Sequence, residues 1–169
     1  YEFWRDYCNY RRWNYNNPKV VTRAAQESKM LRQTHMIEKG MSLSEPRKGF
    51  GQQKIAVLFE MMDQYLKMGY PSDGMPFQDA IIVLNAYVDM QKGLGYENAA
   101  MVEKLKTYDK YRIDGLTAGI KYDTRTNLMS NVDKPFPEFF YSRHSMRQFE
   151  SKSLNIKDVE KAIKIAQKA

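Results

Sequence analysis

The sequence has little cysteine and histidine and no long apolar run. Cys8 is the single cysteine among 169 residues, which excludes an intrachain disulfide framework and a metal site built from several cysteines. His35 has one carboxylate nearby and no further ligands around it, so we expect no metal site. No stretch approaches the roughly 18 apolar residues that a membrane-spanning helix needs. These absences favour a reducing, cytoplasmic location.

The net charge is +7, and the positive charge lies at the two ends of the chain. Residues 1–54 contain eleven Lys and Arg against five Asp and Glu, and residues 135–169 contain seven against four. Residues 55–134 contain nine against eleven. No nucleic-acid-binding motif or basic-aromatic repeat accompanies the basic ends, so we expect no nucleic acid partner. A ligand that carries phosphate is the more economical explanation of such localised clusters.

Apolar residues at helical spacing, together with eleven methionines, predict a mainly α fold. We expect a helix that begins at Asn17 and Pro18 and ends at Gly40, and three more over residues 53–69, 77–93 and 97–113. The helix expected over residues 77–93 is apolar on nearly all sides and should be central. Residues 114–134 lose periodicity and are expected to form a loop or linker. The sequence thus predicts a helical domain over residues 1–130 and a second unit over 131–169.

The first seventeen residues carry seven aromatic side chains, three of them, Phe3, Tyr7 and Tyr10, at helical spacing. This pattern favours a short helix that is buried against the helix that follows. The alternative is an interfacial helix, because Trp, Tyr and Arg suit the headgroup region of a membrane.

A basic segment, "SRHSMRQF" at residues 142–149, precedes a well-specified helix. On extended backbone Arg143, Ser145 and Arg147 point to one side, and guanidinium forks with a hydroxyl suit a phosphate. The alternative is a solvated basic turn. Asn155 is the expected N-cap of the helix that follows, and Leu154 is placed to pack on Val159.

Residues 141–169 resemble the opening of a nitroreductase-family flavoprotein domain, an α+β fold. The matching residues are Arg143, His144, Ser145, Arg147 and Phe149, followed by an amphipathic helix at the expected distance. The resemblance implies that Arg143, Ser145 and Arg147 hold the phosphate and ribityl side of FMN, with His144 as a further contact.

The same resemblance implies an FMN-dependent oxidoreductase that takes reducing equivalents from NAD(P)H and passes them to a small organic acceptor. Family members build the site across a homodimer and add flavin contacts further along the chain. The last helical pattern stops at Ala169 without Gly or Pro, so we expect only the start of the flavin domain here. The alternative function is a non-catalytic helical module that docks a protein partner or a membrane surface.

A second motif, "HMIEKGMSLSEPRKGFG" at residues 35–51, resembles a segment that precedes the flavin domain in a longer subset of the family. His35, Glu38 and Lys39 share one helix face, and Arg47 follows in the connector. One interpretation is a polar site that contacts substrate or flavin. The other is a structural network in which Glu38 bridges to Arg47.

Overall fold

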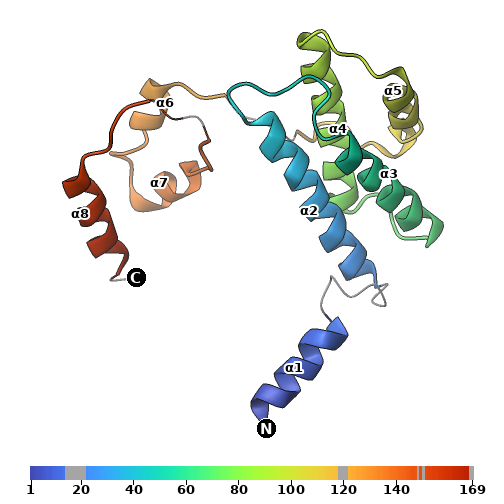
Figure 1. Ribbon diagram of the computed structural model, residues 1–169, viewed down its shortest axis with the longest axis horizontal. Helices are drawn as coiled ribbons and strands as arrows, with labels where there is room; N and C mark the ends of the chain where they lie inside the picture. Colours follow the sequence, from blue (N-terminus) through green and yellow to red (C-terminus); the bar gives the residue numbers. More distant parts are fainter. Residues whose placement is uncertain (14–21, 118–121, 148, 150, 168–169) are drawn as a thin grey trace.

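The computed structural model of the chain describes residues 1–13, 22–117, 122–147, 149 and 151–167, and the described parts are helical, without strands (Figure 1). A mainly α fold is therefore confirmed for these residues. The elements are α1 (Glu2–Trp13), α2 (Arg23–Met41), α3 (Gln52–Lys67), α4 (Met75–Gly93), α5 (Ala99–Lys106), the 3-10 helix η1 (Asp109–Tyr111), α6 (Arg125–Met129), α7 (Phe136–Ser142) and α8 (Ile156–Ala166).

Helices α2 to α5 form one bundle, in which α4 is central (Figure 1). Helix α2 packs against both α3 and α4, and α5 packs against α4. The core is rich in methionine and tyrosine, and its fully buried side chains include Met30, Met62, Tyr65, Phe77 and Leu84. The prediction that the helix around residues 81–84 is central is confirmed, since all four of these side chains are buried.

Two helix boundaries differ from the predictions for local reasons. Helix α2 begins at Arg23, where Thr22 caps it by accepting a hydrogen bond from the backbone N–H of Ala25 at 3.3 Å. The predicted start at residues 17 and 18 lies outside the described residues. Helix α4 begins at Met75, two residues earlier than expected, because a proline follows in its first turn.

The helix predicted over residues 97–113 is wrong in its second half. Helix α5 ends at Lys106, and the chain continues through the 3-10 helix η1. The change of direction buries Tyr108, whose hydroxyl donates a hydrogen bond to a carboxylate oxygen of Asp63 on α3. Burial and this hydrogen bond raise the pKa of the Tyr108 hydroxyl. Tertiary contacts therefore end α5, overriding a pattern that reads as continuous helix.

The prediction of a loop over residues 114–134 is wrong for Arg125–Met129, which form α6. Thr124 caps this short helix by accepting a hydrogen bond from the backbone N–H of Asn127 at 3.2 Å. Helix α7 then occupies the aromatic run before the basic segment. In Figure 1, α6, α7 and α8 lie on the opposite side of α2 from α3, α4 and α5.

The burial predicted for the first helix is also wrong. Phe3, Trp4 and Tyr10 have exposed fractions of 84%, 67% and 66%, and α1 extends away from the bundle in Figure 1. Within the described part of the chain, the aromatic face of α1 has no helix packed against it.

None of the helices in the described residues combines the length and the apolar character needed to cross a membrane.

Candidate functional site

The basic segment lies between α7 and α8 on irregular backbone. Helix α7 ends at Ser142, whose hydroxyl donates a hydrogen bond to the carbonyl oxygen of Phe139 at 2.7 Å. Arg143 follows as the C-cap with φ −68° and ψ 129°, which turns the chain from helical to extended geometry. From this residue the chain continues without regular secondary structure through Arg147.

The predicted phosphate ligands are open to solvent. Arg143, Ser145 and Arg147 are exposed, and neither arginine forms an ion pair with another residue that the structure describes. An arginine already held by a carboxylate would have to break that pair before it bound an anion. Here two guanidinium groups and a hydroxyl group lie within five positions of the chain, where they can bind an anion together.

His144 is partly buried and differs from its neighbours. Its Nδ1 lies 3.0 Å from the carbonyl oxygen of Ser142. A carbonyl oxygen only accepts, so Nδ1 must be the protonated nitrogen. In the neutral ring Nε2 is then an acceptor, which repels phosphate oxygens. The side chain of His144 therefore positions the turn, and a phosphate contact from this residue requires its backbone N–H or a protonated ring.

Helix α8 begins as predicted. The side chain of Asn155 accepts a hydrogen bond from the backbone N–H of Lys157 at 3.1 Å, and the helix starts at Ile156. Its apolar residues form one stripe, of which Ile156 and Ile163 are 73% and 53% exposed. The aromatic side chains of α7 are exposed as well. The basic segment is thus flanked by two helices with uncovered apolar surface.

The second predicted cluster is brought together only in part. His35 Nδ1 lies 3.3 Å from Glu38 Oε2, on an exposed face of α2. Arg47 is also exposed, and the bridge between Glu38 and Arg47 is not formed, because the side-chain contact of Glu38 among the described residues is with His35. Lys39 forms no ion pair within the described chain.

Glu38 also affects Asp79 on α4. Burial raises the pKa of the Asp79 carboxyl group, and the nearby Glu38 carboxylate raises it further.

The remaining residues of this motif fix the connector between α2 and α3. The side-chain amide of Gln91 accepts a hydrogen bond from the backbone N–H of Gly49 at 2.7 Å and donates one to the carbonyl oxygen of Arg47 at 3.3 Å. The Tyr87 hydroxyl donates to the carbonyl oxygen of Phe50 at 2.6 Å. Gln91 and Tyr87 lie on α4 and are almost fully buried. This network holds the backbone of the motif through Gln91 and Tyr87, two residues that sequence reasoning did not include, since a buried glutamine carries no signal in the sequence.

Gly40 is required by the same packing. A Cβ atom at this position would overlap the ring of Phe50, whose Cδ2 would lie only 2.8 Å away. The Phe50 ring is itself held edge-on against Tyr87, at 5.1 Å between centroids. The ring therefore has little freedom to move aside.

Replacing Gly40 by alanine is expected to lower the free energy of unfolding by about 1–3 kcal/mol. A glycine-to-alanine change within a helix ordinarily stabilises by roughly 0.5–1 kcal/mol, so the predicted sign is reversed. Gly93→Ala is the matched control, because a Cβ at this helical glycine meets nothing within 4 Å. Urea denaturation measures both variants. A gain in stability for Gly40→Ala would show that Phe50 does not press on this helix.

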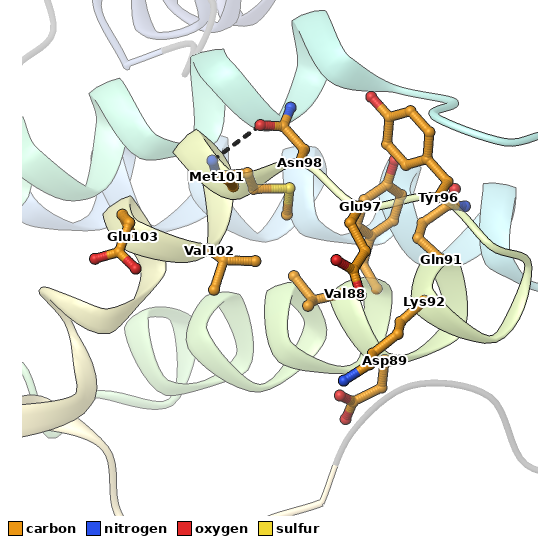
Figure 2. Close-up of a pocket in the computed structure, with 12 residues that line it drawn as sticks. Val88, Asp89, Gln91, Lys92, Tyr96, Glu97, Asn98, Met101, Val102 and Glu103 are labelled. Atoms are coloured by element: carbon orange, nitrogen blue, oxygen red, sulfur yellow. Dashed lines mark hydrogen bonds between the residues drawn. The ribbon is translucent and has the colours of Figure 1, made fainter.

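A pocket of about 360 Å³ lies between α4 and α5 and was not predicted. Figure 2 shows Val88 and Val102 on its two sides, with Glu97 and Lys92 gathered at one end and Glu103 at the other. The Glu103 carboxylate is already paired with Lys106 at 2.7 Å. The pocket holds none of the predicted site residues.

No group of three or more His, Cys, Asp or Glu suited to a metal ion occurs in the part of the chain that the structure describes. The basic segment is the stronger candidate site, because its two exposed arginines have no carboxylate partner among the described residues.

No protein-family model, curated protein or solved structure matches this chain.

Proposed function

We propose that the protein is an FMN-dependent oxidoreductase of the nitroreductase type, whose basic segment holds the phosphate of FMN. The observation that carries the proposal is the pair of exposed guanidinium groups of Arg143 and Arg147, which have no carboxylate partner among the described residues. They lie just ahead of a helix that begins at the position predicted from its N-cap, Asn155.

The chemistry of these residues fits a phosphate monoester. Each guanidinium presents a planar fork that matches two phosphate oxygens, and the Ser145 hydroxyl is free to donate to the third. Arg143, Ser145 and Arg147 would bind and orient the cofactor and form no bond with the reacting atoms. FMN, when bound, supplies the redox chemistry between NAD(P)H and a small organic acceptor.

The uncovered surfaces of α7 and α8 support the same proposal. Phe136 and Phe140 of α7 are 73% and 57% exposed, next to the exposed apolar stripe of α8. Burying such side chains stabilises a protein by about 1.5–3 kcal/mol each, so a folded flavin domain needs a surface over them. In the proposed protein this surface belongs to the remainder of an α+β flavin domain and to the second subunit of a homodimer.

Replacing Arg143 or Arg147 by alanine is expected to weaken FMN binding by more than about 1 kcal/mol each, or roughly fivefold. The protein is expressed from its complete reading frame, purified, and titrated with FMN while flavin fluorescence is followed. Lys161→Ala is the control, because it removes an exposed cation from α8 without touching the basic segment. The phosphate assignment would be refuted if Arg143→Ala and Arg147→Ala bound FMN as tightly as the unmodified protein and the Lys161→Ala control.

The alternative is a non-catalytic helical module that docks a protein partner or a membrane surface. It is favoured by α1, whose aromatic side chains are exposed and lie apart from the bundle (Figure 1). A purified protein that is colourless and fails to take up added FMN would leave this alternative as the better account.

A further inference from the structure

A second, smaller pocket lies where the end of α2, the connector and the start of α3 meet. Its volume is about 200 Å³. Met36 and Ile37 of α2, with Leu43 and Phe50 of the connector, give it apolar walls. Two cationic side chains, Arg47 and Lys54, complete the lining.

Neither of these cations has an acidic partner in the described part of the chain. Lys54 is half-buried, and its ammonium group contacts the Met36 sulfur, a weak acceptor, at 3.9 Å. Elsewhere in the bundle, Arg23 and Lys104 lie 2.7 Å from carboxylate oxygens. The two cations at the pocket are therefore placed to receive negative charge from outside the chain.

The walls of the pocket are fixed before any ligand arrives. The backbone of Arg47 and that of Gly49 are held by the buried amide of Gln91, and the carbonyl oxygen of Phe50 accepts the hydrogen bond from Tyr87. The Phe50 ring is packed against Gly40 and Tyr87. Pre-organised walls reduce the entropy that a ligand must lose on binding.

We propose that this pocket binds a small carboxylate with an apolar body the size of one aromatic ring. A closed cavity of about 150 Å³ holds benzene, so a pocket of this volume has room for a ring and a carboxylate. The apolar walls cover the ring, while Arg47 and Lys54 pair with the carboxylate. Inorganic phosphate is disfavoured, because it offers the walls no apolar surface and is more strongly hydrated.

This proposal does not depend on FMN binding. The lining residues lie on α2, on α3 or on the connector that joins them, whereas the basic segment lies beyond α7. It assigns a ligand class to the motif at residues 35–51, which the proposed flavin site leaves unused.

Benzoate is the probe, and its binding to the ¹⁵N-labelled chain is followed by NMR. We expect saturable shifts of the backbone amides of Ile37, Phe50 and Gly51, which line or border the pocket. Benzyl alcohol, which has the ring without the charge, and inorganic phosphate, which has the charge without the ring, should each bind at least about fivefold more weakly.

Two variants and one control locate the charge contact. Arg47→Gln and Lys54→Gln should each weaken benzoate binding at least about fivefold, and Lys67→Gln, at the exposed far end of α3, should leave it unchanged. Circular dichroism checks that each variant is folded. The proposal is overturned if benzoate gives no saturable shifts, if benzyl alcohol binds as well, or if the shifts fall around Val88 and Met101 in the larger pocket instead.

Discussion

Replacing Phe77 by alanine is expected to lower the free energy of unfolding by about 4 kcal/mol. Phe77 is fully buried on α4, and its ring stacks on Tyr65 at 5.6 Å between centroids. It also meets Tyr108 and Tyr111 edge-on, at 6.2 Å and 6.0 Å. The change therefore removes contacts with three rings, one on α3 and two at η1, and leaves a cavity at the centre of the bundle. Small domains are stable by only about 5–15 kcal/mol, so the loss is a large part of the total.

Urea denaturation followed by circular dichroism measures this effect. Tyr122→Ala is the matched control, because that ring is 76% exposed and its loss should change stability by no more than about 0.5 kcal/mol. If the two alanine variants lost stability equally, the aromatic cluster around Phe77 would not be the core of the fold.

Replacing Gln78 by leucine is expected to cost about 3 kcal/mol, although leucine has nearly the same volume. The fully buried amide donates to the carbonyl oxygens of Ser72 and Tyr111 at 2.6 Å and 2.7 Å, and accepts from the backbone N–H of Ile113 at 2.9 Å. Leucine would leave these three backbone groups without a partner, and each partly buried group left unpaired costs about 1–3 kcal/mol.

The Gln78 variant should also loosen one particular segment. Because the amide ties the chain after η1 to α4, residues 109–117 should become sensitive to limited proteolysis before the bundle unfolds. Gln53→Leu, an exposed change on α3, serves as the control. Unchanged stability and unchanged cleavage in the Gln78 variant would show that water replaces the amide at little cost.

The sequence predicted those parts of the fold that depend on local signals. Asn155 begins α8 as expected, and the spacing of Ile55, Leu58 and Met62 identifies the buried face of α3. The failures have tertiary causes. Helix α5 stops because Tyr108 turns inward toward Asp63, and α1 presents its aromatic face to solvent, although composition predicted burial.

The candidate site also combines features that local sequence signals indicate with features that depend on tertiary contacts. The basic segment is exposed on irregular backbone, which fits both alternatives that the sequence left open, so its role as a phosphate site stays a prediction. The network around Gln91, Tyr87 and the connector was not predictable, since glutamine normally lies on the surface. Gly40 and Phe50 could be identified from the sequence as parts of a motif, but not as residues in contact with each other. Their contact became apparent once α2 and the connector were placed.

The most direct test of the phosphate clamp compares FMN with riboflavin, which lacks the phosphate, on the protein from the complete reading frame. Two arginines on one phosphate predict that FMN binds at least about thirtyfold more tightly, and that Arg143→Ala with Arg147→Ala removes most of this difference. Equal affinity for the two flavins in the unmodified protein would contradict the account, as would a preference for FMN that survives the loss of both arginines.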